Sequence, residues 1–64
     1  MTTHHALIVM VPKPRVKAFV SVGFVPVRSN GVEDTMFRRC ADEGEAMRAG
    51  RRLNDLIWSV EAVE

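Results

Sequence analysis

The sequence lacks most of the features that would assign it a chemistry. It has one Cys, one Trp and no Tyr among its 64 residues. A single Cys excludes a disulfide framework within the chain and a zinc site built from several cysteines. No apolar run approaches the ~20 residues that a membrane-spanning helix needs, so no membrane role is expected. Because an unpaired Cys fits a reducing compartment, the protein is expected in the cytoplasm.

The composition is that of one small globular domain. Hydrophobic residues make up 47% of the chain and charged residues 27%, with a net charge of +1. These values are ordinary for a folded domain and differ from those of a disordered tail. A domain of this size buries only ~60% of the surface that its unfolded chain exposes, which leaves little room for an enzyme pocket. We therefore expect a single domain over residues 1–64, with a flexible terminus over residues 1–5 and no small-molecule substrate.

Three segments in the first forty residues predict β-strands. Residues 6–11 form an apolar, β-branched run, and residues 16–27 form a longer run rich in Val and Phe. Asn30 and Gly31 are typical of a hairpin turn, because both tolerate the positive φ of a type I′ turn. A third strand is then predicted over residues 32–40, completing an antiparallel meander.

A helix is predicted after the meander of residues 6–40. Asp42, followed by Glu45 three residues later, forms a capping box, and apolar residues recur at helical spacing as far as Val60. The expected helix covers residues 42–60. The predicted fold is α+β in the order β-β-β-α, a three-stranded antiparallel sheet with one C-terminal helix packed on one face.

This fold would leave a second apolar sheet face uncovered. Successive residues of a strand point to opposite faces, so one face takes the helix and the other carries Ile8, Met10 and Phe19. Antiparallel sheets normally expose a polar face instead. The first strand is also expected at the edge of the sheet, with no charge or proline inside it. These features predict a contact surface for a protein partner or a second copy of the chain. The alternative is that the termini or the bent second strand shield this face.

Charge is distributed unevenly along the chain. Six Lys and Arg against two Asp and Glu give residues 1–40 a net charge of +4, and three against six give residues 41–64 a net charge of −3. Such a split can steer an anionic partner to the sheet. The basic residues that would form a nucleic-acid surface are Lys17, Arg28, Arg38 and Arg39. A net charge of only +1 is low for a nucleic-acid-binding domain, so this is the alternative function.

No catalytic or metal-binding constellation is present. The sequence contains no Gly-rich phosphate loop, no paired metal-ligand spacing and no catalytic triad pattern. Cys40 is the one nucleophile candidate, since two arginines and a following helix N-terminus favour a thiolate. The two histidines, His4 and His5, lie near the terminus and supply no general base. We therefore expect a structural Cys40, and we expect no enzyme activity, metal or cofactor.

The predicted function is a small non-catalytic protein-binding module. It would act through the exposed sheet face and the edge strand, either as a homodimer or docked on a larger protein complex. A chain of this size suits an accessory or inhibitory polypeptide of the kind that phages and mobile elements encode, which is an argument by analogy. The alternative is a sheet-based DNA- or RNA-binding protein.

Overall fold

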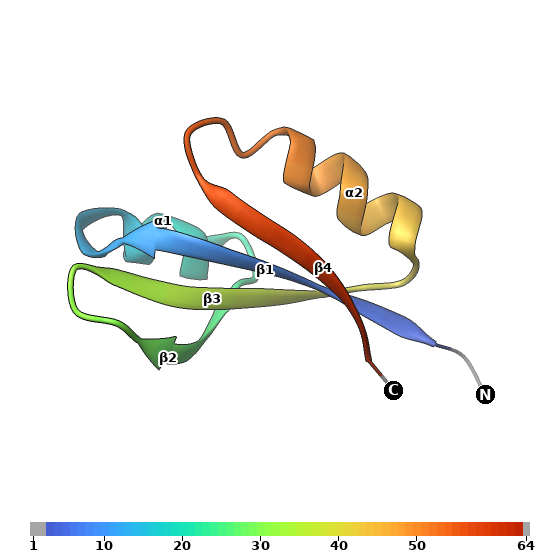
Figure 1. Cartoon of the computed structure of the whole chain (residues 1–64), viewed down its shortest axis with the longest axis horizontal. Coiled ribbons are helices and arrows are strands. Elements are labelled where there is room, and N and C mark those ends of the chain that lie inside the picture. Colours follow the sequence, from blue (N-terminus) through green and yellow to red (C-terminus); the bar gives the residue numbers. More distant parts are fainter. Residues whose placement is uncertain (1–2, 64) are drawn as a thin grey trace.

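Four antiparallel strands and two α-helices make up the fold in the computed structural model, which describes residues 3–63 (Figure 1). In chain order the elements are β1 His4–Pro12, the 3₁₀ turn η1 Lys13–Arg15, α1 Val16–Ser21, β2 Val25–Ser29, β3 Glu33–Cys40, α2 Glu43–Arg51 and β4 Ile57–Val63. The strand order in the sheet is β2-β3-β1-β4, so β1 and β3 are the inner strands.

The connections interleave two β-α-β units. β3 is antiparallel to both β1 and β2, so β1 and β2 run parallel to each other with β3 between them. In the same way, β3 and β4 run parallel on the two sides of β1. The order β-α-β-β-α-β is the split β-α-β arrangement that is also called ferredoxin-like. The prediction of an α+β fold with an antiparallel sheet is confirmed, whereas the three-stranded meander with one terminal helix is wrong.

The segment predicted as the second strand begins with a helix. In α1, Val16 and Phe19 pack against the core, whereas Lys17 and Ala18 between them are exposed, which is the spacing of a helix. Pro14 lies in the preceding turn, where its missing N–H is not needed. The β-branched valines favour a strand locally, but packing overrides that preference. The first strand therefore has no hairpin partner after it, and β1 lies inside the sheet instead of at its edge.

The predicted C-terminal helix ends early, and a fourth strand follows it. The Oδ1 atom of Asp42 accepts a hydrogen bond of 2.8 Å from the N–H of Glu45, so the predicted cap is confirmed. α2 nevertheless ends at Arg51, and Asp55 adopts a φ of 70° where the chain turns back. The first residues of Ile57–Val63 then alternate between exposed and half-buried. The apolar spacing assigned to one helix thus belongs to a helix and a strand.

The turn at Asn30 and Gly31 joins β2 to β3 as predicted, but it is longer than a type I′ turn. Three residues separate the two strands, and only Gly31 has a positive φ, of 96°. Asn30 bonds to Glu33 twice, through its backbone N–H (3.0 Å) and through its Oδ1 (3.1 Å). Because of this loop and a bulge in β2, Arg28 pairs with Thr35.

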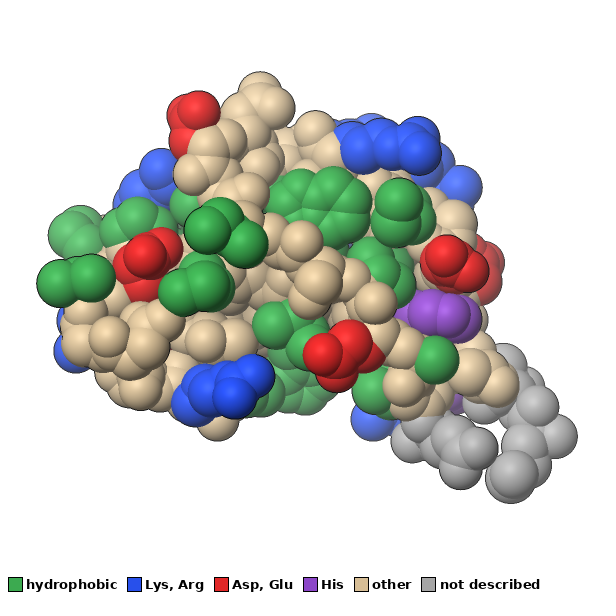
Figure 2. All heavy atoms as spheres, in the orientation of Figure 1, with side chains coloured by type: hydrophobic (Ala, Val, Ile, Leu, Met, Phe, Trp, Pro, Cys, Tyr) green, Lys and Arg blue, Asp and Glu red, His purple; other side chains and the backbone are tan. Residues whose placement is uncertain are grey.

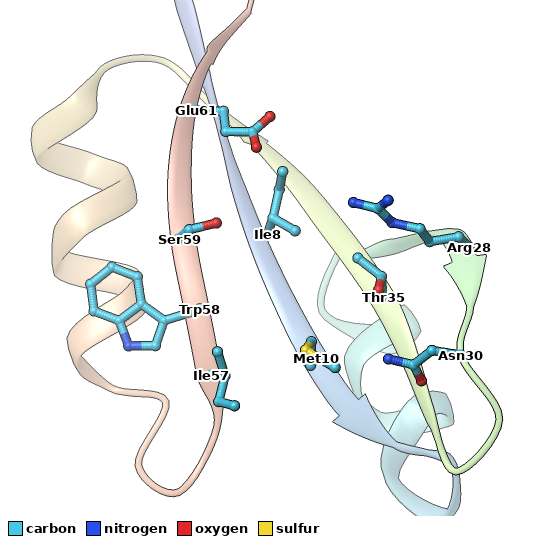
Figure 3. A pocket seen from close by; sticks show the side chains of 9 residues that line it. All are labelled: Ile8, Met10, Arg28, Asn30, Thr35, Ile57, Trp58, Ser59 and Glu61. Carbon is cyan, nitrogen blue, oxygen red and sulfur yellow. The ribbon is translucent and has the colours of Figure 1, made fainter.

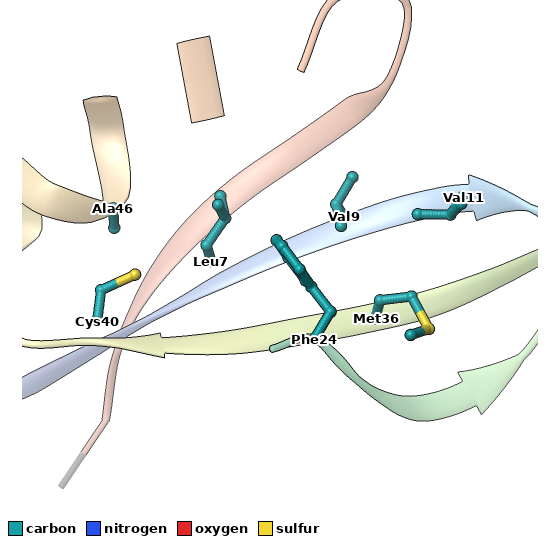
Figure 4. Packing of buried hydrophobic residues seen from close by; sticks show 7 residues of the cluster. All are labelled: Leu7, Val9, Val11, Phe24, Met36, Cys40 and Ala46. Carbon is teal, nitrogen blue, oxygen red and sulfur yellow. The ribbon is translucent and has the colours of Figure 1, made fainter. Parts of the chain in front are cut away.

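The core lies between the sheet and the two helices (Figure 4). Side chains from alternate positions of β1 and β3 form its floor, and the largest fully buried ones are Leu7, Val9, Val11, Met36 and Cys40. Ala46 of α2 closes one end of this layer. Phe24 packs over the middle of the layer, and the ring of Phe19 packs edge-on against it with centroids 5.3 Å apart. Both helices therefore cover the same face of the sheet.

Candidate functional site

The sheet face opposite the helices carries the candidate site. Within residues 3–63 no element packs on this side, because both helices contact the core on the other side. We call this surface the open face. Its residues are Val27 and Arg28 of β2, Thr35, Phe37 and Arg39 of β3, Ala6, Ile8 and Met10 of β1, and Ile57, Ser59, Glu61 and Val63 of β4. Hydrophobic side chains also reach the molecular surface between separate charged groups in Figure 2.

The centre of the open face is apolar. In the register, Ile8 lies between Phe37 and Ser59, and Met10 lies beside Ile57 in the next cross-strand row. Ile8, Met10 and Phe37 are half-buried, whereas Ile57 is 71% exposed. Two adjoining hollows of about 400 Å³ and 500 Å³ lie over this centre. Figure 3 shows the side chains that line the first of them. Because a sheet covered on one side normally turns polar side chains to water on the other, this centre is a candidate contact surface.

Charged side chains of both signs border the apolar centre. Arg39 and Glu61 lie in one row on the two sides of Ala6, so two strand spacings, about 10 Å, separate their Cα atoms. Arg28 of β2 and Glu61 of β4 extend toward the centre from opposite sides (Figure 3). Arg39 of β3 lies on the same side of β1 as Arg28. Glu33 lies at the loop end of β3, beyond the apolar rows. Next to the centre, the β2–β3 half is therefore positive and the β4 half negative.

The residues predicted for a protein interface do not share one surface. Ile8 and Met10 lie on the open face, where their alternation with the buried residues of β1 places them. Phe19 lies in α1, on the helix side, where it packs against Phe24. Its predicted position on the second sheet face is wrong, because the segment around it folds as a helix and does not pair with β1. Phe37 of β3 occupies the position beside Ile8 instead.

The four basic residues predicted for nucleic acid are divided as well. Arg28 and Arg39 line the open face. Lys17 is exposed on α1. Arg38 pairs with the buried Leu7 and lines a groove between α1 and α2 on the helix side. The fold therefore brings two of these four residues together and places the other two elsewhere.

Cys40 has the environment of a packing residue. Its side chain is 2% exposed, and its Sγ donates a long hydrogen bond of 3.8 Å to the carbonyl oxygen of Arg38. Burial, and next the negative charge of Glu45, raise the pKa of the Cys40 thiol above its ordinary value. The thiolate-favouring environment that the sequence indicated is therefore absent at Cys40. Within residues 3–63, no group of three His, Cys, Asp or Glu side chains could hold a metal ion.

Half of the open face was missed by reasoning from the sequence. Phe37 was assigned to a strand but to no face of it, Ile57 was assigned to the predicted helix, and Glu61 follows the end of that helix at residue 60. The signal that could have found them is alternation with period two. Phe37 and Arg39 are two residues apart, and Ile57 is followed at the same spacing by Ser59 and then Glu61.

Comparison with known proteins gives no relative from which a function could be transferred. No protein family, curated protein or solved structure matches the chain. Between residues 3 and 63 there is no helix with the length and apolar character needed to cross a membrane.

Proposed function

We propose that the chain is a small non-catalytic protein-binding module whose contact surface is the open face. The observation that carries this proposal is the apolar centre of Ile8, Met10 and Phe37 on the side of the sheet that neither helix covers. Complete burial of one large apolar side chain contributes about 1.5–3 kcal/mol, and these half-buried residues gain part of that amount. Such a gain is substantial for a domain whose total stability is expected at about 5–15 kcal/mol.

The contact is made by side chains of the face and not by the backbone of β1. β1 is an inner strand, so its N–H and C=O groups are already paired with β3 and β4. The two edge strands differ: β2 carries Pro26 and a bulge, which protect an edge from further pairing, whereas β4 has no proline and pairs with β1 in an unbroken register. The side chains of the open face are therefore the surface that a partner contacts.

Photo-crosslinking from inside the open face tests this proposal. Ile57 is 71% exposed on the open face and Val32 is 79% exposed in the β2–β3 loop, so the two positions are matched in exposure and differ in surface. A photoreactive residue at position 57 should give a protein adduct in cells that produce the chain, and one at position 32 should not. Phe37→Glu should abolish the adduct. No adduct from position 57, or equal adducts from both positions, would contradict the proposal.

The setting proposed for this module is the cytoplasm, because the free thiol of Cys40 suits a reducing compartment. An accessory or inhibitory polypeptide bound to a larger complex, of the kind that phages and mobile elements encode, is consistent with its size by analogy alone. Fractionation of the producing cells, followed by the mass of the adduct from position 57, tests both statements.

A second candidate function is nucleic-acid binding through the same face. It is favoured by Phe37, which shares the open face with Arg28 and Arg39, since bases stack on aromatic rings beside basic side chains. Glu61 on the same face and Glu33 at its end oppose a polyanion. Titration with labelled single-stranded DNA and RNA at low salt tests it, because binding that uses phosphate contacts weakens steeply as salt is added. Undetectable binding at low salt would eliminate this candidate.

A further inference from the structure

We infer that the partner of the open face is a second copy of the chain, stacked face to face about a two-fold axis along β1, with Glu61 of each copy opposite Arg39 of the other. The inference rests on the proposed function, because it names the occupant of the same surface. It is carried by the arrangement of charge around the apolar centre.

A two-fold interface uses the same patch on both copies, so the patch has to be complementary to itself. An axis along β1 lays β4 of one copy over β3 of the other. Glu61 and Arg39 lie in the same row, one strand away from β1 on either side. Each Glu61 therefore meets an Arg39, and the dimer gains two ion pairs related by symmetry. The same axis brings the two copies of Ile8 together at the centre.

An axis perpendicular to the strands would lose this complementarity. If this axis passed over the row of Ile8, Glu61 would lie over Ile57 of the other copy and Arg39 would lie over Thr35. The reason is that Glu61 and Arg39 share the row on one side of Ile8, and Ile57 and Thr35 share the row on the other side. Both charges would then lie over uncharged side chains. The positions of the charges thus select the axis along β1.

The charge of the open face fits a second copy better than a polyanion. An axis along β1 overlaps β3, β1 and β4 of the two copies and leaves β2 outside the overlap. Strands of about eight residues across three strand spacings give a projected overlap of roughly 400 Å² per copy. The total of about 800 Å² is below the range of stable complexes, so a weak dimer is expected. The charges of Arg28 and Arg39 balance those of Glu61 and Glu33. A neutral face does not repel its own copy.

Complementary charge reversal tests this inference. Wild type, Glu61→Arg and Arg39→Glu are each studied by sedimentation equilibrium from 1 µM to 1 mM, alone and as an equimolar mixture of the two variants. Each variant alone places like charges opposite each other twice, so its dissociation constant should rise by at least about tenfold. The mixture should restore a dimer, since both pairs are then opposite in sign. Lys17→Glu is the matched control, because it makes the same charge change on exposed α1 and should leave the dimer intact.

Three results would overturn the inference. Wild type could remain at 7.2 kDa throughout, the mixture could be no tighter than the separate variants, or the dimer could survive both reversals, which would place the contact along the β4 edge or elsewhere.

These outcomes are distinct from failure of the proposed function. If wild type is monomeric but position 57 crosslinks to another protein, the open face is a contact surface for a different partner. If wild type is monomeric and position 57 gives no adduct, both proposals fail. Circular dichroism of each variant verifies that the exposed substitutions leave the fold intact.

Discussion

The close contact between α2 and β4 depends on the absence of a side chain at Gly50, so Gly50→Ala should destabilise the protein. Gly50 is buried in α2, and a Cβ atom built there would lie 2.5 Å from Cε3 and Cζ3 of Trp58 and 2.7 Å from its Cδ2. Carbon atoms in real structures do not approach so closely, so the indole ring has to move. In Figure 3 the ring points toward α2 and away from the open face.

Two opposing effects set the magnitude of this change. Replacing Gly by Ala in an exposed helix stabilises it by up to about 1 kcal/mol, whereas forcing a methyl group into a packed site costs about 1–3 kcal/mol. The net loss at Gly50 is therefore about 1 kcal/mol, which for a domain of this size lowers Tm by roughly 4–8 °C. Urea denaturation provides the free energy, and the emission of Trp58, the only Trp, reports whether its ring moves.

Gly44→Ala is the control within the same helix. A Cβ atom at Gly44 would meet the guanidinium Nη1 of Arg48 and the Oδ1 of Asp42, each at 3.2 Å, and the exposed Arg48 can move aside. No loss of stability is expected at Gly44. If Gly50→Ala is as stable as wild type and the Trp58 emission is unchanged, the packing of α2 on β4 is not as described.

Three further predictions concern the cap, the thiol and the core. Asp42→Ala should cost about 1 kcal/mol because the helix loses its N-cap acceptor, and Asp42→Asn, which keeps an acceptor oxygen, should cost less in the same urea titration. Cys40 should react with a thiol reagent far more slowly in the folded chain than in urea. Because folding raises the pKa of the Cys40 thiol, the protonated thiol contributes to the free energy of unfolding. This contribution is fully present below the unfolded pKa and is lost as pH rises through the folded pKa. A thiol that reacts as fast in the folded chain as in urea would contradict this. Phe19→Glu should cost about 2–4 kcal/mol, whereas Phe37→Glu should leave the chain folded, and the reverse order of their melting temperatures would invert the two faces.

Local signals in the sequence predicted local structure. The cap at Asp42 and the turn at Gly31 are set by side-chain hydrogen bonds and by a backbone angle that few residues tolerate, so a few neighbouring residues specify them. The alternation along β1 likewise separated the buried residues from Ile8 and Met10. These features do not depend on which segments meet in the fold.

The strand order and half of the open face depend on contacts between distant segments. Val16–Ser21 has the β-branched residues of a strand but becomes helix, because Val16 and Phe19 cover core that β3 and β1 create together. The apolar side chains within residues 53–60 fit both the spacing of a helix and the alternation of a strand. The packing of Trp58 on Gly50 selects the strand. Without that assignment β4 and its Glu61 could not be placed beside β1.

The proposal that the open face is a contact surface is tested most directly by amide chemical shifts recorded as the protein is concentrated from 10 µM to 1 mM. If the open face binds a second copy, the largest changes should fall on Ile8, Phe37 and Ser59 at its centre, while the amides of α1 and α2 stay constant. Phe37→Glu should abolish these changes without loss of the folded spectrum. Shifts confined to the helices, or no shift anywhere together with no crosslinked partner at position 57, would contradict the account.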